Sequence, residues 1–227
     1  MSFIGLAFSW LPMVFAIFLS EFRSTKYKRS VQSLTTIPNF ISWVLVYSVA
    51  FAIFSTDGFF NWILGSFGLI DSVTGPVNHL MNNNYVWWQM WAWGTWRGLG
   101  WGAIIYIASI ASIDPQLYEA ATMDGAGRFH RMWYVTVPGL IPTFFVLLLL
   151  GIANILNSGI EQHMVFYNAV NADMIETINL YVFHVGLAHG DHIPLATLIG
   201  MTQSLISLVL LFSANGLSKL LRGESIV

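Results

Sequence analysis

The chain lacks cysteine and carries very little charge. Charged residues make up 9% of its 227 positions and hydrophobic residues make up 56%, whereas about 25% charged residues is usual for a soluble domain. The absence of cysteine excludes a disulfide framework and thiol chemistry, and it leaves the redox compartment open. So few charges cannot cover the apolar surface of a soluble fold, and the composition therefore predicts an integral membrane protein. The net charge of −2 argues against a nucleic-acid partner.

Long apolar runs dominate what is present. A helix needs about 20 mostly apolar residues to cross a hydrocarbon core. Five stretches reach this length, at roughly 3–20, 32–55, 87–112, 139–158 and 193–214. We therefore predict an all-α, polytopic membrane helix bundle that forms a single transmembrane domain over residues 1–227. The apolar run at 58–70 is short and interrupted by glycines, and we expect it to lie along the interface or on the outer face.

Lysine and arginine are missing from two of the connections, at 56–86 and 159–192. The basic residues gather in the other connections and at the end of the chain: Arg23, Lys26, Lys28, Arg29, Arg128, Arg131, Lys219 and Arg222. The positive-inside rule places the basic segments in the cytoplasm and the two bare loops outside. This orientation puts the N-terminus outside. Residues 1–20 have neither the basic start nor the cleavage site of a signal peptide, so we expect that an upstream span is missing.

A polar segment, YEAATMDGAGRFHRMWYVTVPGLIP, separates the third and fourth spans. Asp114 is a good N-cap and Pro115 suits a first helical position, which predicts a short helix over about 115–123. Asp124-Gly125 is a turn signal at which glycine can adopt a positive φ. A second short helix should follow, with Pro138 and Pro142 marking the start of the next span. The pattern predicts a cytoplasmic elbow at about 114–138, or an ordinary amphipathic loop.

The strings Glu119-Ala120-Ala121 and Asp124-Gly125-Ala126, followed by Pro138, resemble the EAA loop of ABC-importer permease subunits. This is the MetI-like family of binding-protein-dependent transport. The resemblance covers essentially the whole chain. Within the family, the chain looks like the polysaccharide and oligosaccharide (LplB-type) branch. The stretches that carry it are SWVLVYSVAFAIFS, GWGAIIYIASIASIDPQLYEAA, NSGIEQHMVFYN and ETINLYVFHVGL. Family members begin in the cytoplasm with one more span, which agrees with the orientation inferred from charge.

The resemblance implies a non-catalytic, multi-pass subunit of a bacterial inner-membrane importer. Its expected partners are a second permease, a cytoplasmic ABC ATPase dimer, an extracytoplasmic sugar-binding lipoprotein and membrane lipid. No cofactor is expected on this chain, since ATP and Mg²⁺ would bind to the ATPase. The elbow would be the coupling helix, and the residues expected to contact the ATPase are Glu119, Ala120, Ala121, Asp124, Gly125 and Arg128. Arg128 and Arg131 could equally serve as positive-inside anchors.

A sugar path needs hydrogen-bonding groups and flat apolar faces. At the outer end of the predicted fourth span and just beyond it, Asn154, Asn157 and Glu161 recur at helical spacing, with Gln162 next to them. Polar groups within lipid are costly and tend to face a bundle interior or a cavity. These residues either line the path or form a helix-packing stripe.

A second stripe in the predicted second span could also stack on sugar. Asn39, Trp43 and Tyr47 repeat every four residues, and they either line the path or belong to the core or an interface. Arg97 is the one charge inside a predicted span, and it either snorkels, pairs with an acid or faces the path. The tryptophans around it are typical of an interface belt and could also stack on sugar: Trp87, Trp88, Trp91, Trp93, Trp96 and Trp101.

Two other classes of protein remain as alternatives. Histidines gather on the predicted outer side, at His184, His189 and His192 with Asp191, and also at His79 and His163. Such residues could hold a metal in a membrane metalloenzyme, but no HExxH or repeated histidine box is present. The chain could instead be half of a channel or of an ATP-independent transporter, which would leave the elbow unexplained. No phosphate-binding glycine motif is visible, so we expect no ATP hydrolysis by this chain itself.

Overall fold

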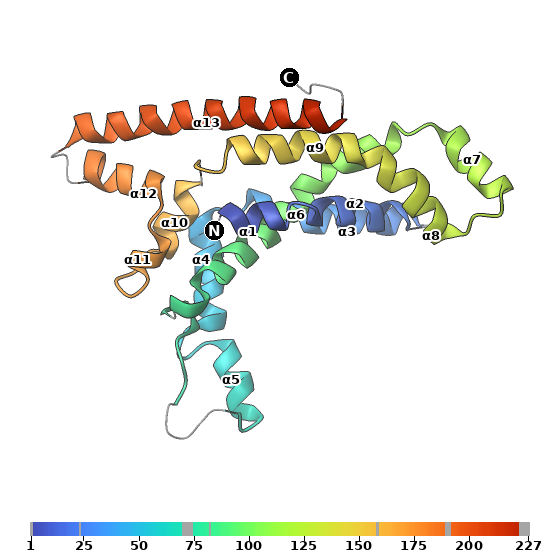
Figure 1. Ribbon diagram of the computed structural model, residues 1–227. Coiled ribbons are helices and arrows are strands. Elements are labelled where there is room, and N and C mark those ends of the chain that lie inside the picture. The colour runs from blue at the N-terminus through green and yellow to red at the C-terminus, as the bar shows by residue number, and fades with distance from the viewer. Residues whose placement is uncertain are drawn as a thin grey trace. The chain divides into compact units, whose positions relative to one another are not determined.

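The computed structural model describes residues 2–22, 24–69, 75–81, 83–157, 159–188 and 192–222. These residues form helices joined by short turns, and no β-strand occurs among them (Figure 1). The prediction of an all-α protein is therefore confirmed. Arg23, His189 and Asp191, which the sequence singled out, lie outside the described residues.

Long helices alternate with groups of short ones. The first half of the chain forms α1 (Ser2–Ala7), α2 (Leu11–Ser20), α3 (Thr25–Thr36), the 3-10 turn η1 (Ile37–Phe40), α4 (Trp43–Phe54), α5 (Phe59–Ser66), the 3-10 turns η2 (His79–Met81) and η3 (Asn83–Tyr85), and α6 (Val86–Ala111). The second half forms α7 (Pro115–Met123), α8 (Arg128–Arg131), the π-helical segment η4 (Met132–Thr136), α9 (Val137–Ala153), α10 (Ile160–Phe166), α11 (Ala172–Ile175), α12 (Ile178–Phe183), the π-helical segment η5 (His184–Ala188) and α13 (Ile193–Arg222).

Four helical runs are long and apolar enough to cross a membrane, namely Ser2–Ser20, Trp43–Ser66, Arg128–Ala153 and Ile193–Gly216. The helices α6 and α7 pass the same test as a pair and are bent by 69° at the break between them. The described chain therefore holds up to five spans, as the sequence predicted. The run at 58–70, expected at the interface, supplies α5, which is counted with α4 in one candidate span.

The predicted bounds of the second span, 32–55, are wrong. The α-helix α3 ends at Thr36, a 3-10 turn follows, and α4 begins at Trp43. Pro38 interrupts the α-helical hydrogen-bond ladder because it has no backbone N–H to donate. Ser42 then restarts the helix as an N-cap, because its hydroxyl accepts a hydrogen bond from the amide of Leu45 at 3.4 Å.

The predicted fourth span, 139–158, is also wrong at both ends. The helix already begins at Arg128, because η4 joins α8 to α9 without a break. Pro138 lies in the first turn of α9 and Pro142 lies inside it, and the π-helical segment before them is a recognised way of absorbing a disturbed ladder. At the other end the side-chain amide of Asn154 donates to the carbonyl of Leu150 at 2.9 Å where the helix stops.

The described residues fall into two compact units, each assembled from segments that are far apart in sequence. Residues 41–94 and 157–203 form one, which we call the aromatic unit, and residues 2–40, 95–156 and those from 204 onward form the other, the elbow unit. The helices α6 and α13 contribute to both. Whether 1–227 acts as one domain stays a prediction.

The core of the aromatic unit is built by α4, α6 and the short helices after α9. Its buried residues are Val46, Ala50, Leu80, Val86, Met90, Phe166 and Ile175. Asn61 on α5 is also buried, and its amide donates to the carbonyls of Ser55, Thr56 and Val77 at 2.8–3.0 Å. One side chain thus satisfies three carbonyls of the connections around α5.

The core of the elbow unit packs α2 against α6 and α9. Its buried residues are Ala16, Ile17, Ala103, Tyr106 and Leu140. The last turn of α3 also approaches α6 closely, since a Cβ added to Gly100 would lie 2.3 Å from the carbonyl oxygen of Thr35. The hydroxyls of Ser109 and Thr143, on α6 and α9, are 2.8 Å apart and hydrogen-bonded. The elbow projects from this three-helix core.

Candidate functional site

The elbow begins with a capped helix, as predicted. Asp114 accepts a hydrogen bond from the amide of Gln116 at 2.9 Å, and Pro115 occupies the first turn of α7. The cap uses an oxygen to satisfy a free N–H, and the proline has no N–H to satisfy. This local chemistry ends α6 and starts α7 within a few residues, which produces the 69° bend between the two helices.

The turn after α7 is a Schellman motif centred on Gly125. The amide of Ala126 donates to the carbonyl of Ala121 at 2.9 Å, and the amide of Gly125 donates to the carbonyl of Thr122 at 3.0 Å. Gly125 has a φ of +77°, which residues with a Cβ adopt only at a cost. The positive φ expected at the Asp124-Gly125 signal is therefore confirmed.

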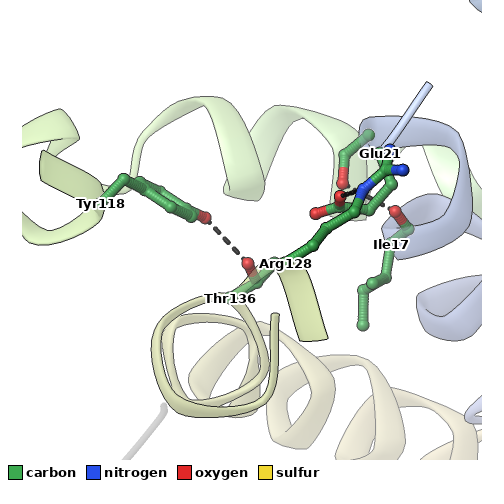
Figure 2. Close-up of polar contacts among 6 residues, drawn as sticks. Ile17, Glu21, Tyr118, Arg128 and Thr136 are labelled. Atoms are coloured by element: carbon green, nitrogen blue, oxygen red, sulfur yellow. Dashed lines mark hydrogen bonds and ion pairs between the residues drawn. The ribbon is translucent and has the colours of Figure 1, made fainter. Parts of the chain in front are cut away.

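Side chains tie α7 to the helix that follows it. The hydroxyl of Tyr118 lies 3.0 Å from that of Thr136, and Arg131 donates to the hydroxyl of Thr122 at 3.1 Å. Figure 2 shows the tyrosine ring pointing across the elbow to the threonine. Thr136 is buried, at 2% exposure. Since the two arms are joined through both backbone and side chains, the elbow has the contacts of a single rigid piece.

Arg128 links the elbow to the end of α2. Its Nε donates to Oε2 of Glu21, across 107 residues of sequence (Figure 2). A groove of about 230 Å³ surrounds the pair, and it is lined by Phe18, Glu21, Phe22, Arg128, Phe129 and Met132. Sequence reasoning missed Glu21, since nothing near it in the sequence marks a partner.

One face of α7 is left uncovered. Gln116, Glu119, Ala120 and Met123 recur at helical spacing and are all exposed, Met123 at 88%. Among the predicted coupling residues Asp124, Gly125 and Arg128 are exposed as well, whereas Ala121 is partly buried. The elbow thus offers a mixed acidic and apolar face, and such exposed apolar side chains are typical of an interaction surface.

The helical stripe expected at Asn39, Trp43 and Tyr47 does not form. Asn39 lies in η1 of the elbow unit, whereas Trp43 and Tyr47 lie on α4 of the aromatic unit. Both aromatic rings make edge-on contacts with Phe166, at centroid distances of 6.5 and 5.1 Å. The structure therefore shows them packing against the core of their unit, and their place on a sugar path stays a prediction.

The common helical face expected for Asn154, Asn157 and Glu161 is also absent, because α9 ends at Ala153 and α10 begins at Ile160. All three side chains are exposed. Gln162, by contrast, is buried, and its amide donates to the carbonyl of Met90 at 2.6 Å. Gln162 thus joins α10 to α6 within the aromatic unit.

An amide chain that the sequence reasoning missed runs through the aromatic unit. Asn179 on α12 donates to Oδ1 of Asn157 at 3.1 Å, and Gln203 on α13 donates to Oδ1 of Asn179 at 3.0 Å. Asn179 and Gln203 are partly buried, and Gln203 lies inside a candidate span. A helix-spaced search cannot find this set, because its members come from three separate segments.

Arg97 and the tryptophans around it lie on α6, and Arg97 is partly buried. The indole of Trp87 donates to the carbonyl of Met174 at 2.8 Å, and Trp93 meets Phe54 edge-on at 6.3 Å. These two tryptophans therefore have packing roles in the aromatic unit.

The histidines do not converge in the part of the chain that the structure describes. No group of three His, Cys, Asp or Glu side chains suited to a metal occurs there. The Nδ1 of His163 is hydrogen-bonded to the carbonyl of Gly159 at 2.8 Å, and Nδ1 of His184 lies 3.5 Å from Glu176. Burial lowers the pKa of the His163 imidazole, against the opposing effect of that hydrogen bond.

Comparisons with known proteins agree on one group. The sequence model of "Binding-protein-dependent transport system inner membrane component" matches residues 11–223. The chain is 36% identical to Protein LplB of Bacillus subtilis over 92% of this chain and 64% of the relative. It is 37% identical to the polygalacturonan/rhamnogalacturonan transport system permease protein YteP of the same species, over 95% of this chain and 66% of the relative. The chain thus spans about two thirds of the length of these relatives.

A solved structure is similar over almost the whole chain. A chain of the bacterial alginate ABC transporter, in complex with an alginate pentasaccharide-bound periplasmic protein, superposes with a TM-score of 0.90 at 29% identity. The match covers 99% of this chain and 77% of the other. The helical arrangement described above is therefore one that a transporter subunit is known to adopt.

Proposed function

We propose, from the premise that this chain belongs to the family of inner membrane components of binding-protein-dependent transport systems, that it is a permease subunit of an ATP-driven importer for an oligosaccharide or polysaccharide. The substrate class is supported by the substrates of two similar proteins, the polygalacturonan/rhamnogalacturonan permease and the alginate transporter. The cytoplasmic membrane of a bacterium is the matching location. In that membrane the basic segments of the chain would face the cytoplasm.

The elbow is the observation that carries this proposal. It lies between two apolar helical runs, on the side that the charge pattern assigns to the cytoplasm. It is internally braced by Tyr118 and Arg131, yet it exposes Glu119, Ala120 and Met123. A braced piece with an uncovered face suits the transfer of motion from a separate protein. We assign that face to a cytoplasmic ATPase dimer.

The proposed mechanism needs no covalent chemistry on this chain. ATP and Mg²⁺ act on the partner ATPase, whose closure displaces the elbow. Because α9 continues from α8 and η4 without a break, and α6 is joined to α7 by a short bend, the displacement reaches both spans through the chain itself. The transporter then has two packed states, and their equilibrium depends on nucleotide at one end and on a loaded sugar-binding lipoprotein at the other. A second permease subunit completes the membrane part.

For the sugar path we retain the predicted residues and add the amide chain. Asn157, Asn179 and Gln203 offer donors and acceptors from three segments, and such groups are costly in lipid unless they meet partners or a cavity. The remaining proposed path residues are Asn39, Trp43, Tyr47, Arg97, Asn154, Glu161 and Gln162.

The test uses the full chain, co-expressed with a candidate second permease, ATPase and binding protein and reconstituted in liposomes. We expect Glu119→Lys to release the ATPase from the affinity-purified membrane subunits and to abolish sugar-stimulated ATP turnover. Asp173→Lys is the matched control, because it makes the same charge change at an exposed acid on α11, which belongs to the aromatic unit. Sugar uptake by Asn179→Leu in the same vesicles tests the path, with retention of the ATPase as its control.

Two results would overturn the proposal. If Glu119→Lys keeps its ATPase and its sugar response while the membrane subunits remain folded, the elbow is not the coupling surface. If the wild-type chain moves sugar without any ATPase, it belongs to a transporter of another class. Unchanged uptake by Asn179→Leu would remove the amide chain from the path and leave the elbow untouched.

A further inference from the structure

The contact between Glu21 and Arg128 joins two parts of the elbow unit that the backbone does not connect directly. Arg128 is the first residue of α8, at the elbow, and Glu21 is the C-cap residue of α2. The helices α6 and α9 run into the elbow through the chain itself, but α2 is 107 residues away from Arg128 in sequence. A displacement of the elbow therefore reaches α2 only through packing and side-chain contacts.

The pair is partly exposed and lines a groove whose other residues are apolar. The groove walls at Phe18, Phe22, Phe129 and Met132 are apolar, and they keep water from part of the two charged groups. The side chain of Glu21 is 31% exposed and that of Arg128 is 51% exposed. At these exposures solvent still screens much of the attraction, so the pair is expected to stabilise the fold by no more than about 1 kcal/mol and matters for which segments it joins.

A positive charge close to the end of α2 is favourable. A carboxylate at a helix C-terminus lies close to the negative end of the helix dipole, which is unfavourable. The last turn of α2 contains no basic residue, and Arg128 supplies the positive charge from the elbow. Arg131, the other arginine of α8, is directed to Thr122 instead. The two arginines therefore have separate contacts, one within the elbow and one between the elbow and α2.

We propose that the Glu21–Arg128 pair is a latch that makes α2 follow the elbow when the elbow is displaced. Through Ala16 and Ile17, α2 packs in the buried core with α6 and α9. Of the three helices in this core, the chain joins only α6 and α9 to the elbow. The latch adds a connection from the elbow to the third, α2. The inference rests on the proposed function, because it assumes that the elbow receives motion from an ATPase. It assigns Glu21 and Arg128 a positioning role, which for Arg128 replaces the ATPase contact that the resemblance implied.

The test is a charge exchange in the reconstituted transporter. Glu21→Arg and Arg128→Glu each place like charges together, and the double variant restores opposite charges in reversed order. We expect Glu21→Arg to keep the ATPase bound while its sugar-stimulated turnover falls about fivefold or more, the lower end of usual coupling between sites. The double variant should recover most of that loss. Lys26→Glu, on the neighbouring helix α3, controls for charge reversal close to the membrane.

A second measurement does not depend on exchanged charges. The chain has no cysteine, so Glu21→Cys with Arg128→Cys can be joined selectively by a short bifunctional maleimide. Before cross-linking, we expect the double-cysteine variant to lose most of its sugar-stimulated ATP turnover. After cross-linking, the turnover should recover.

The outcomes separate the latch from the proposed function. If Glu21→Arg responds to sugar as the wild type does, or if neither the double variant nor the linked pair recovers, the latch is refuted while the elbow can still be the coupling surface. If Glu21→Arg releases the ATPase, Glu21 belongs to the docking surface and the latch is again refuted. The proposed function is tested separately: it fails if a transporter that carries Glu119→Lys keeps its ATPase and its sugar-stimulated turnover.

Discussion

Replacing Gly125 by alanine isolates the backbone cost of the elbow turn. A Cβ added to Gly125 would meet no heavy atom within 4 Å, so the substitution introduces no clash. What remains is the φ of +77°, which costs a residue with a Cβ about 1–2 kcal/mol. The whole effect should therefore come from strain in the turn that separates α7 from α8.

Gly127→Ala provides the matched control two residues away. Gly127 has a φ of −67° and also has open space around the position of a Cβ. Both alanines restrict the unfolded chain to a similar extent, by roughly 0.4–1 kcal/mol. This contribution cancels in the comparison. The difference between the two variants should be the strain of about 1–2 kcal/mol, less the cost of alanine in place of glycine at the N-cap of α8, which Gly127 occupies.

Hydrogen exchange measured by mass spectrometry in detergent or nanodiscs would detect this difference. The amides at positions 125 and 126 are held by the carbonyls of Thr122 and Ala121, so their exchange reports opening of the turn. An energy of 1–2 kcal/mol corresponds to about 5- to 30-fold faster exchange in Gly125→Ala than in Gly127→Ala. Equal exchange in the two variants would refute the view that positive φ at Gly125 holds the elbow in shape.

Two further predictions concern stability away from the elbow. Gly100→Ala should destabilise the chain by about 1–3 kcal/mol, because its Cβ would lie 2.3 Å from the backbone oxygen of Thr35. Gly98→Ala has no atom within 4 Å and should be neutral or stabilising by up to about 1 kcal/mol; equal thermal unfolding of the two variants in detergent would contradict the close approach. Burial lowers the pKa of His163, so the folded chain resists a proton that the unfolded chain accepts once the pH falls below about 6.5. Unfolding temperatures should therefore drop between pH 7.5 and 5.5 by less in His163→Gln than in the wild type, and an identical drop would show that His163 contributes nothing.

The elbow could be predicted from sequence because its determinants are local. Asp114 and Pro115 specify the start of α7, and Gly125 specifies its end, through atoms within a few residues of each. The number of spans could be predicted for a related reason, since each apolar run carries its own signal. The function of the coupling and path residues stays a prediction, although the family itself is shown by the comparisons.

Helix breaks inside apolar runs were the main error. Hydropathy averages over a window, so it continued the second span through Pro38 and the fourth span past Asn154. Each break had a visible cause, a proline without an N–H in one case and an asparagine, Asn154, that bonds to the helix backbone in the other. The two path stripes failed with these helices, since helical spacing has no meaning across a break.

Contacts between distant segments were out of reach for another reason. Glu21 and Arg128 are 107 residues apart, and Asn179 meets partners 22 and 24 residues away. The side chains that join segments in this way are ordinary polar residues whose local sequence predicts only exposure. Their role becomes visible once the helices are packed, because packing decides which of them meet.

This division between local and distant determinants bears on how a coupling element must be built. If the shape of the elbow depended on contacts with the spans, every movement of the spans would reshape the surface that its partner holds. A cap at Asp114 and a turn at Gly125 instead set the two ends of α7 through local atoms, and the brace from Tyr118 to Thr136 fixes α7 to the start of the helical run Arg128–Ala153. Contacts such as Glu21–Arg128 then only have to pass on its position. Under the proposed function, α7 and the start of that run would be displaced together, and disruption of the Glu21–Arg128 contact should weaken coupling without altering the surface that the ATPase would bind.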